Sequence, residues 1–211
     1  MKINRTDVRK ILETLKDRYP VVNTQLEHET PFQLLIATIM SAQCTDKQVN
    51  KVTRELFRIF PDPESLSAAP LSKIKQIIFS TGFYNNKAKN IKACSQAVLD
   101  RHGGEVPDDI ELLTQLPGVG RKTANVVRSV SFGHQTIVVD THVLRISRRL
   151  GLTDEKDPVK IEFDLMKIIP ESCWNDLSLQ LIYFGREICD AKKPKCSRCP
   201  LYEVCPTKGR I

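Results

Sequence analysis

The stretch of sequence that decides the fold is residues 108–132, which read DDIELLTQLPGVGRKTANVVRSVSF. Apolar residues recur at helical spacing on both sides of the turn LPGVG, so the stretch predicts two helices, Asp108–Gln115 and Arg121–Phe132. Gly118 and Gly120 permit positive φ angles and allow another molecule to approach the backbone closely. The second helix then begins with open N–H groups and the positive end of its dipole, which together favour phosphate.

This turn differs from the phosphate-binding loop of nucleotide-binding proteins. The run from Gly118 to Thr123 does not have the GxxxxGK[ST] spacing, and it follows a helix instead of a strand. Taken alone, the stretch fits an ordinary structural hairpin of two helices as well as it fits a phosphate site.

Helical periodicity extends over nearly the whole chain of 211 residues. The run from Phe32 to Met40 is apolar almost all round and follows Pro31, which predicts a central buried helix. Thr45 is placed to cap the next helix, and a longer helix from about Asn85 is expected to end at Gly103-Gly104. Only Thr136–Val139 resembles a strand, and it is too short to build a sheet. The fold class expected is all-α.

Four cysteines lie close together near the end of the sequence, with the spacing C-x6-C-x2-C-x5-C: Cys189, Cys196, Cys199 and Cys205. Four thiolates gathered so tightly are ligands for a tetrahedral metal or an iron–sulfur cluster. Two disulfides are the alternative. The spacing leans towards a four-iron cluster over zinc, because structural zinc sites usually pair two CxxC-like hairpins. Of the other three cysteines, Cys94 lies on an apolar helical stripe and is expected to be buried.

The net charge is +7, and residues 183–211 carry seven basic against three acidic side chains, or +4 of that total. A basic excess of this size favours a polyanionic partner, since Lys and Arg neutralise phosphates. Neither a signal peptide nor an apolar run of membrane length is visible, so a cytoplasmic protein is expected.

Five sequence motifs, which follow one another along the chain in the order typical of one protein family, resemble the signatures of that family. The hairpin LPGVGRKTANVV (residues 116–127), SAQCTDKQVN (41–50), GFYNNKA (82–88), VDTHVLR (139–145) and the four-cysteine loop are similar to the signatures of the endonuclease III family of helix-hairpin-helix DNA glycosylases. The resemblance covers essentially the whole chain. It implies a 4Fe-4S cluster held by the four cysteines, and so decides for iron.

The resemblance also implies architecture and activity. Residues 23–134 would form a helical barrel domain that contains the helix-hairpin-helix (about 108–132), and residues 1–22 with 135–211 a discontinuous cluster domain with its cluster loop at 189–205. A DNA groove would lie between these two all-α domains. The implied enzyme is a monomer associated with the nucleoid. It excises oxidised pyrimidines from duplex DNA that contains a damaged base or an abasic site, and cleaves the strand on the 3′ side by β-elimination.

Two residues match the catalytic positions of the family. Lys122 matches the nucleophile, whose uncharged amine attacks the sugar carbon and forms a Schiff base. Asp140 matches the catalytic carboxylate; it also precedes a helix, where Asp commonly serves as N-cap. His142 is better explained by local hydrogen bonding and is left out of the catalytic set.

Six residues are expected to contact DNA. Gln43 matches the residue that enters the space left by the flipped nucleotide, and Phe83 stands where familiar bacterial relatives carry an aliphatic wedge. Gly118, Gly120 and Arg121 in the hairpin, and Lys193 in the cysteine loop, are expected at phosphates.

Four rival functions are considered. An adenine-removing relative is disfavoured, because Lys122 is present and Leu34-Leu35-Ile36-Ala37 contains no carboxylate. A thymine-mismatch glycosylase differs mainly in the shape of its base pocket. A non-catalytic iron–sulfur DNA-binding regulator would need neither Lys122 nor Asp140, and a structural zinc module would be colourless where a 4Fe-4S protein is brown.

Overall fold

The structure is a computed structural model that describes residues 4–209. Every regular element in that range is helical, and no strand is found there, so the all-α expectation is confirmed. The chain divides into two compact units. Thr24–His134 form the contiguous unit, whereas the two-segment unit joins the stretch that ends at Asn23 to the stretch that begins at Gln135.

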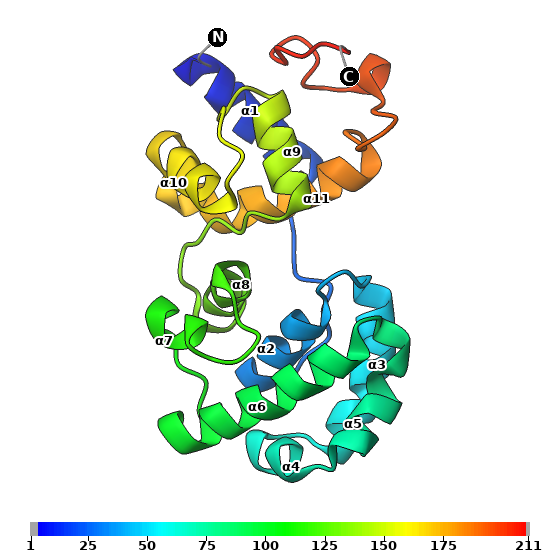
Figure 1. Cartoon of the computed structure of the whole chain (residues 1–211). Helices are drawn as coiled ribbons and strands as arrows, with labels where there is room; N and C mark the ends of the chain where they lie inside the picture. Colours follow the sequence, from blue (N-terminus) through cyan, green and yellow to red (C-terminus); the bar gives the residue numbers. More distant parts are fainter. Residues whose placement is uncertain (1–3, 210–211) are drawn as a thin grey trace. The chain divides into compact units, whose positions relative to one another are not determined.

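The contiguous unit contains seven α-helices and one 3₁₀ turn (Figure 1). They are α2 (Pro31–Met40), α3 (Asp46–Ile59), α4 (Pro63–Ala68), α5 (Leu71–Ile78), η1 (Phe79–Thr81), α6 (Tyr84–His102), α7 (Ile110–Thr114) and α8 (Arg121–Phe132).

The helix α2 is the centre of this unit. All of its residues from Phe32 to Met40 are buried, as the apolar run predicts, and α2 contacts α3, α6 and α8. Thr30 caps its first turn by accepting a hydrogen bond from the Gln33 N–H. Because side chains all round the helix leave water, α2 lies at the centre of the hydrophobic core, which α3, α5, α6 and α8 complete.

The two-segment unit contains the remaining helices (Figure 1). They are α1 (Arg5–Arg18), α9 (Thr141–Arg149), α10 (Pro158–Ile168), η2 (Glu171–Cys173), α11 (Trp174–Glu187) and η3 (Cys196–Arg198). Its core gathers apolar side chains from α1, α9, α10 and α11, with Phe184 of α11 almost fully buried among them.

Side-chain contacts fix α1 against α11. The Tyr19 and Tyr183 rings stack with their centroids 5.9 Å apart, and Arg18 pairs with Glu187. The Tyr19 hydroxyl donates to the same Glu187 carboxylate at 2.6 Å. These contacts hold the N-terminal helix in a unit whose other elements all lie beyond residue 134.

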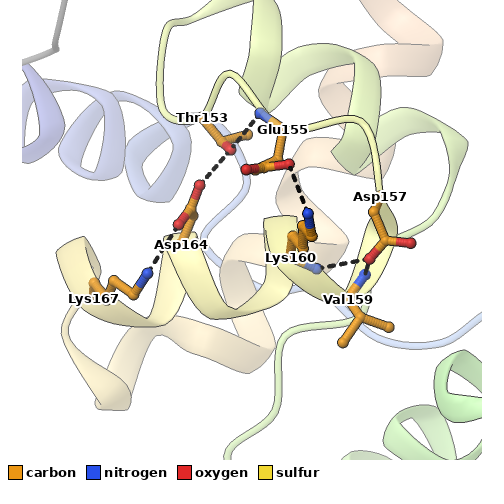
Figure 2. Close-up of polar contacts among 7 residues, drawn as sticks. All are labelled: Thr153, Glu155, Asp157, Val159, Lys160, Asp164 and Lys167. Carbon is orange, nitrogen blue, oxygen red and sulfur yellow. Dashed lines mark hydrogen bonds and ion pairs between the residues drawn. The ribbon is translucent and has the colours of Figure 1, made fainter.

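A polar network ties the loop before α10 to that helix (Figure 2). The Thr153 hydroxyl donates to Asp164 at 2.8 Å, and Glu155 lies 4.0 Å from the Lys160 amine. Asp157 is the N-cap of α10, and its Oδ1 accepts from two backbone N–H groups, each at 3.0 Å. Figure 2 shows these contacts on one face of α10.

One sequence interpretation is wrong in detail. Thr136–Val139 is extended but forms no strand with any described segment. Side chains of α11 satisfy its backbone instead: Asn175 accepts from the Thr136 N–H and Ser178 from the Val138 N–H, both at 2.9 Å. The segment that leads to Asp140 is thus hydrogen-bonded to side chains of α11.

Candidate active site

The turn between α7 and α8 is built around Gly118. This residue has φ +78°, a conformation that favours glycine, and a Cβ placed there would lie 2.9 Å from the Asn90 Cβ of α6. The Val119 N–H donates to the Leu116 carbonyl at 3.1 Å and closes the turn. Gly118 is therefore required both by the backbone and by the packing of the hairpin on α6.

Gly120 differs from the expectation of a positive φ. It is extended, with φ −96° and ψ 175°, and no described atom lies within 4 Å of where its Cβ would be. It precedes α8, for which no side chain in the described range supplies an N-terminal cap. The absence of a side chain at Gly120 therefore leaves open space beside the uncapped first amides of α8.

Lys122 is the second residue of α8, and its side chain is exposed. Arg121 precedes it and is half-buried. The helix places the Lys122 amine at the same end as the uncapped amides, where an anion would bind. The arrangement places an exposed primary amine at a helix start that has no side-chain cap.

Asp140 is the N-cap of α9, as the sequence predicts. Its Oδ1 accepts hydrogen bonds from the N–H groups of His142 and Val143, both at 2.8 Å, and neither bond uses Oδ2. The side chain is half-buried. A carboxylate held by two rigid backbone donors keeps its orientation, and its second oxygen can act on a reacting group.

His142 has a structural partner, in agreement with its exclusion from the catalytic set. Its Nδ1 lies 3.1 Å from Nη2 of Arg145, whose guanidinium also donates to the Cys189 carbonyl at 3.0 Å. Burial lowers the pKa of His142, although the Asp140 carboxylate opposes that change. The ring is therefore mostly neutral at pH 7 and contacts Arg145, which links α9 to the start of the cysteine loop.

Gln43 and Phe83 share an unusual backbone conformation. Their φ angles are 53° and 48°, in the left-handed region that non-glycine residues rarely adopt. Both side chains are exposed, Phe83 to 65%. Strained conformations of this kind persist only where the surrounding structure enforces them, and they concentrate at functional sites.

The four loop cysteines gather in one place. All are free thiols that are half-buried, and all line a single cavity together with Leu150, Phe184 and Ile188. Burial raises the pKa of Cys199 above its ordinary value, and the negative charges of the other three thiols raise it further. Within residues 4–209 no three metal-binding side chains meet as the ligands of one ion do. Thiols around a shared cavity fit a multi-iron cluster better than a single zinc ion.

Arg149 supports this loop, and sequence reasoning did not single it out. Its Nη1 donates to Cys189 Sγ at 3.4 Å and to the Asp190 carbonyl at 2.7 Å, while Nη2 donates to the Ala191 carbonyl at 2.9 Å. Arg145 and Arg149 lie four residues apart on α9. This spacing, which places them on the same face of the helix, is the signal in the sequence that could have identified them.

Lys193 is exposed in the loop. Its backbone N–H and that of Lys192 donate to the Asp190 carboxylate at 3.0 and 2.9 Å, and these bonds lower the pKa of Asp190. The loop backbone is therefore ordered, and it presents its basic side chains to solvent.

Comparison with known proteins agrees with this geometry. Residues 36–171 match the HhH-GPD superfamily of base excision DNA repair proteins, and residues 189–205 match the iron–sulfur binding domain of endonuclease III. The helix-hairpin-helix fold and the cysteine loop thus define the class of base excision repair proteins. The chain belongs to the endonuclease III family of that superfamily.

Two curated relatives are similar over nearly their full length. Endonuclease III of Synechocystis sp. is 50% identical over 199 residues, which is 94% of this chain and 91% of the relative. Endonuclease III of Bacillus subtilis is 46% identical over 204 residues, or 96% of this chain and 93% of the relative.

Solved structures show the same likeness. A trapped endonuclease III–DNA covalent intermediate has a TM-score of 0.94 at 45% identity and covers 99% of this chain and 98% of its own. A thermostable thymine-DNA glycosylase has a TM-score of 0.84 at 24% identity, covering 98% of this chain and 97% of its own, and shares the fold alone. No helix among the described residues is both long and apolar enough to span a membrane.

Proposed function

We propose that this chain is a bifunctional DNA N-glycosylase and abasic-site lyase that excises oxidised pyrimidines from duplex DNA. The observation that carries the proposal is Lys122, an exposed amine in the first turn of a helix whose N-terminal amides are uncapped. The endonuclease III relatives support the same reaction.

Lys122 is the proposed nucleophile. Its uncharged Nζ forms a bond to C1′ of the damaged nucleotide, the glycosidic bond breaks, and the base leaves with the electron pair and a proton. The sugar ring then opens to an imine between C1′ and Nζ. Loss of a 2′ proton breaks the C3′–O bond, so the strand is cleaved on the 3′ side.

Asp140 is the proposed catalytic carboxylate. Because its Oδ1 is fixed by two backbone N–H groups, Oδ2 is held in one direction and can stabilise positive charge that develops on the sugar, or accept a proton. This oriented negative charge needs no reorganisation during the reaction.

The DNA contacts divide into two kinds. Gln43 and Phe83 are proposed to enter the duplex, Gln43 beside the estranged base and Phe83 between base steps. Phosphates are proposed to lie against the backbone around Gly118, Gly120 and Arg121, and near Lys193. The left-handed backbone at Gln43 and Phe83 supports the first assignment, and the uncapped start of α8 supports the second.

The four loop cysteines are the proposed ligands of a 4Fe-4S cluster. When bound, the cluster supplies four metal–thiolate bonds that order the basic loop. On this basis we assign Thr24–His134 as the helix-hairpin-helix domain and the two-segment unit as the cluster domain. The proposed enzyme acts as a monomer on DNA of the nucleoid.

Borohydride trapping tests the nucleophile, since borohydride reduces an imine to a permanent link. A duplex with one thymine glycol is expected to become cross-linked to the protein, and Lys122→Gln to abolish the cross-link and strand cleavage while leaving DNA affinity nearly unchanged. Lys89→Gln, at an exposed lysine of α6, is the matched control and is expected to be trapped normally. Trapping of Lys122→Gln would place the nucleophile elsewhere.

Cys199→Ala tests the ligand set. The variant is expected to lose the brown colour of the cluster and to become less stable, because the loop loses the bonds that order it. Cys94→Ala is the comparison: Cys94 is fully buried on α6, and its removal is expected to lower stability while the colour remains. A brown Cys199→Ala protein would show that the ligands are wrong.

A further inference from the structure

A second phenylalanine, Phe79, is exposed close to Phe83. It begins η1, four residues before Phe83, and its side chain is 64% exposed. Isolated apolar residues on a surface are common, but one short segment here exposes two large rings.

Phe79 is held in place although it is exposed. Its ring centroid lies 4.8 Å from that of Tyr84, with the planes tilted by 52°. The Thr81 hydroxyl donates to the Ile78 carbonyl at 2.8 Å, and the buried Lys87 amine donates to the Thr81 carbonyl at 2.8 Å. The segment between the two phenylalanines is therefore rigid, and the exposure of Phe79 does not come from a loose loop.

The same segment is joined to the loop that carries Gln43. Gln48, in the first turn of α3, donates from Nε2 to the Ser80 hydroxyl at 2.6 Å, and its backbone N–H donates to Thr45 at 3.3 Å. Both loops belong to the contiguous unit. Gln48 therefore links η1, which carries Phe79, to Thr45 at the end of the loop that carries Gln43.

The charge around Phe79 favours nucleic acid over an acidic surface. Residues 71–83 contain Lys73 and Lys75 and no acidic residue. A basic segment with exposed rings is the usual composition of a surface that stacks on bases while lysines approach phosphates.

We infer that Phe79 is a second aromatic contact for duplex DNA, which stacks on a base exposed beside the site where Phe83 enters. This inference rests on the proposed function and extends it, because it makes the DNA-inserting element a pair of rings. Tyr84 supports the Phe79 ring from behind, so little side-chain freedom is lost on binding.

Affinity measurements test the inference. Phe79→Leu keeps apolar packing on Tyr84 but removes the stacking ring, whereas Phe79→Tyr keeps the ring. For a duplex with a tetrahydrofuran abasic analogue, Phe79→Leu is expected to weaken binding by about tenfold, and Phe79→Tyr to bind nearly as the parent does. Phe163→Leu, at a ring of α10 that is 46% exposed, is the matched control and is expected to be unchanged. Equal affinities for all four proteins would overturn the inference.

A fluorescence measurement covers the case in which Phe79→Leu perturbs the fold. Trp174 is the one tryptophan of the chain, so Phe79→Trp in a Trp174→Phe background reports on position 79 alone. Saturating DNA is expected to quench the fluorescence of this tryptophan, since a stacked base quenches indole. A tryptophan placed at position 163 instead is expected to keep its fluorescence. No quenching at position 79 would contradict the stacking. Absence of borohydride trapping by the parent protein would instead overturn the proposed function itself.

Discussion

The helices α8 and α9 begin in opposite ways. No side chain of the described chain caps α8 at Gly120, whereas Asp140 caps α9 through two hydrogen bonds of 2.8 Å. Both starts present the orphan N–H groups that every helix has. On α8 no side-chain cap uses these groups, and Lys122 lies in the same turn; on α9 two of them hold a carboxylate.

The difference in capping suggests a different role for the start of each helix. Glycine at the N-cap costs only about a few tenths of a kcal/mol compared with a capping side chain, so α8 loses little stability by having no cap. At the start of α9 two amides orient the Asp140 carboxylate, so the proposed catalytic side chain is also the cap. A phosphate can bind at the first start, and a fixed negative charge exists at the second.

Asp140→Asn is the strongest test of this comparison. Asparagine keeps the shape of the cap and removes the charge, so base release in single turnovers is expected to slow by roughly 10²- to 10⁴-fold, with DNA affinity little changed. Asp157 caps α10 with the same two-bond geometry, seen in Figure 2, and Asp157→Asn is the matched control. An equal loss of rate in both variants would reduce Asp140 to a structural cap.

The two glycines of the hairpin separate folding from DNA binding. In Gly118→Ala the alanine would have to adopt a positive φ, and its Cβ would lie 2.9 Å from the Asn90 Cβ. The substitution is therefore expected to lower the free energy of unfolding by roughly 1–3 kcal/mol. Gly120→Ala requires no positive φ and creates no steric clash, so its thermal stability should be near that of the parent. Its methyl group stands beside the open amides, so affinity for undamaged duplex should fall by a few-fold. Normal DNA binding by Gly120→Ala would indicate that phosphate does not approach there.

Lys193→Ala gives the smallest expected effect. Loss of one phosphate contact should weaken binding to all duplexes alike and flatten the plot of log affinity against log salt by about 0.9. Lys160→Ala removes an exposed lysine of α10 and is expected to leave the slope unchanged. Gly120→Ala should also keep the parent slope, because backbone amides carry no net charge. A parental slope for Lys193→Ala would remove that residue from the DNA contacts.

Sequence reasoning is most reliable where local chemistry decides. The helix Arg121–Phe132 and the caps Thr45 and Asp140 are confirmed, because each depends on residues within one turn. The first hairpin helix is shorter than Asp108–Gln115: it runs Ile110–Thr114, since Asp109 caps it. Cys94 is buried as expected, and burial raises its pKa to about 12.

Features that depend on distant residues were not predictable. The conformation of Gly120 follows from how the hairpin closes, and the extended Thr136–Val139 is satisfied by side chains of α11 that lie 39 and 40 residues away. The hydrogen bond from Arg149 to Cys189 joins residues that are 40 positions apart in the sequence. The roles of Lys122, Asp140 and the DNA-contact residues come from the family motifs and stay predictions.

The pairing of α1 with α11 has a consequence for synthesis of the chain. Arg18 and its partner Glu187 are separated by 169 residues, and Tyr19 stacks on Tyr183. A ribosome releases α1 long before α11, the helix that packs against it. The contiguous unit can close while translation continues, and we expect α1 to wait with its apolar face uncovered until α11 appears. During that interval the apolar face of α1 is available to a chaperone.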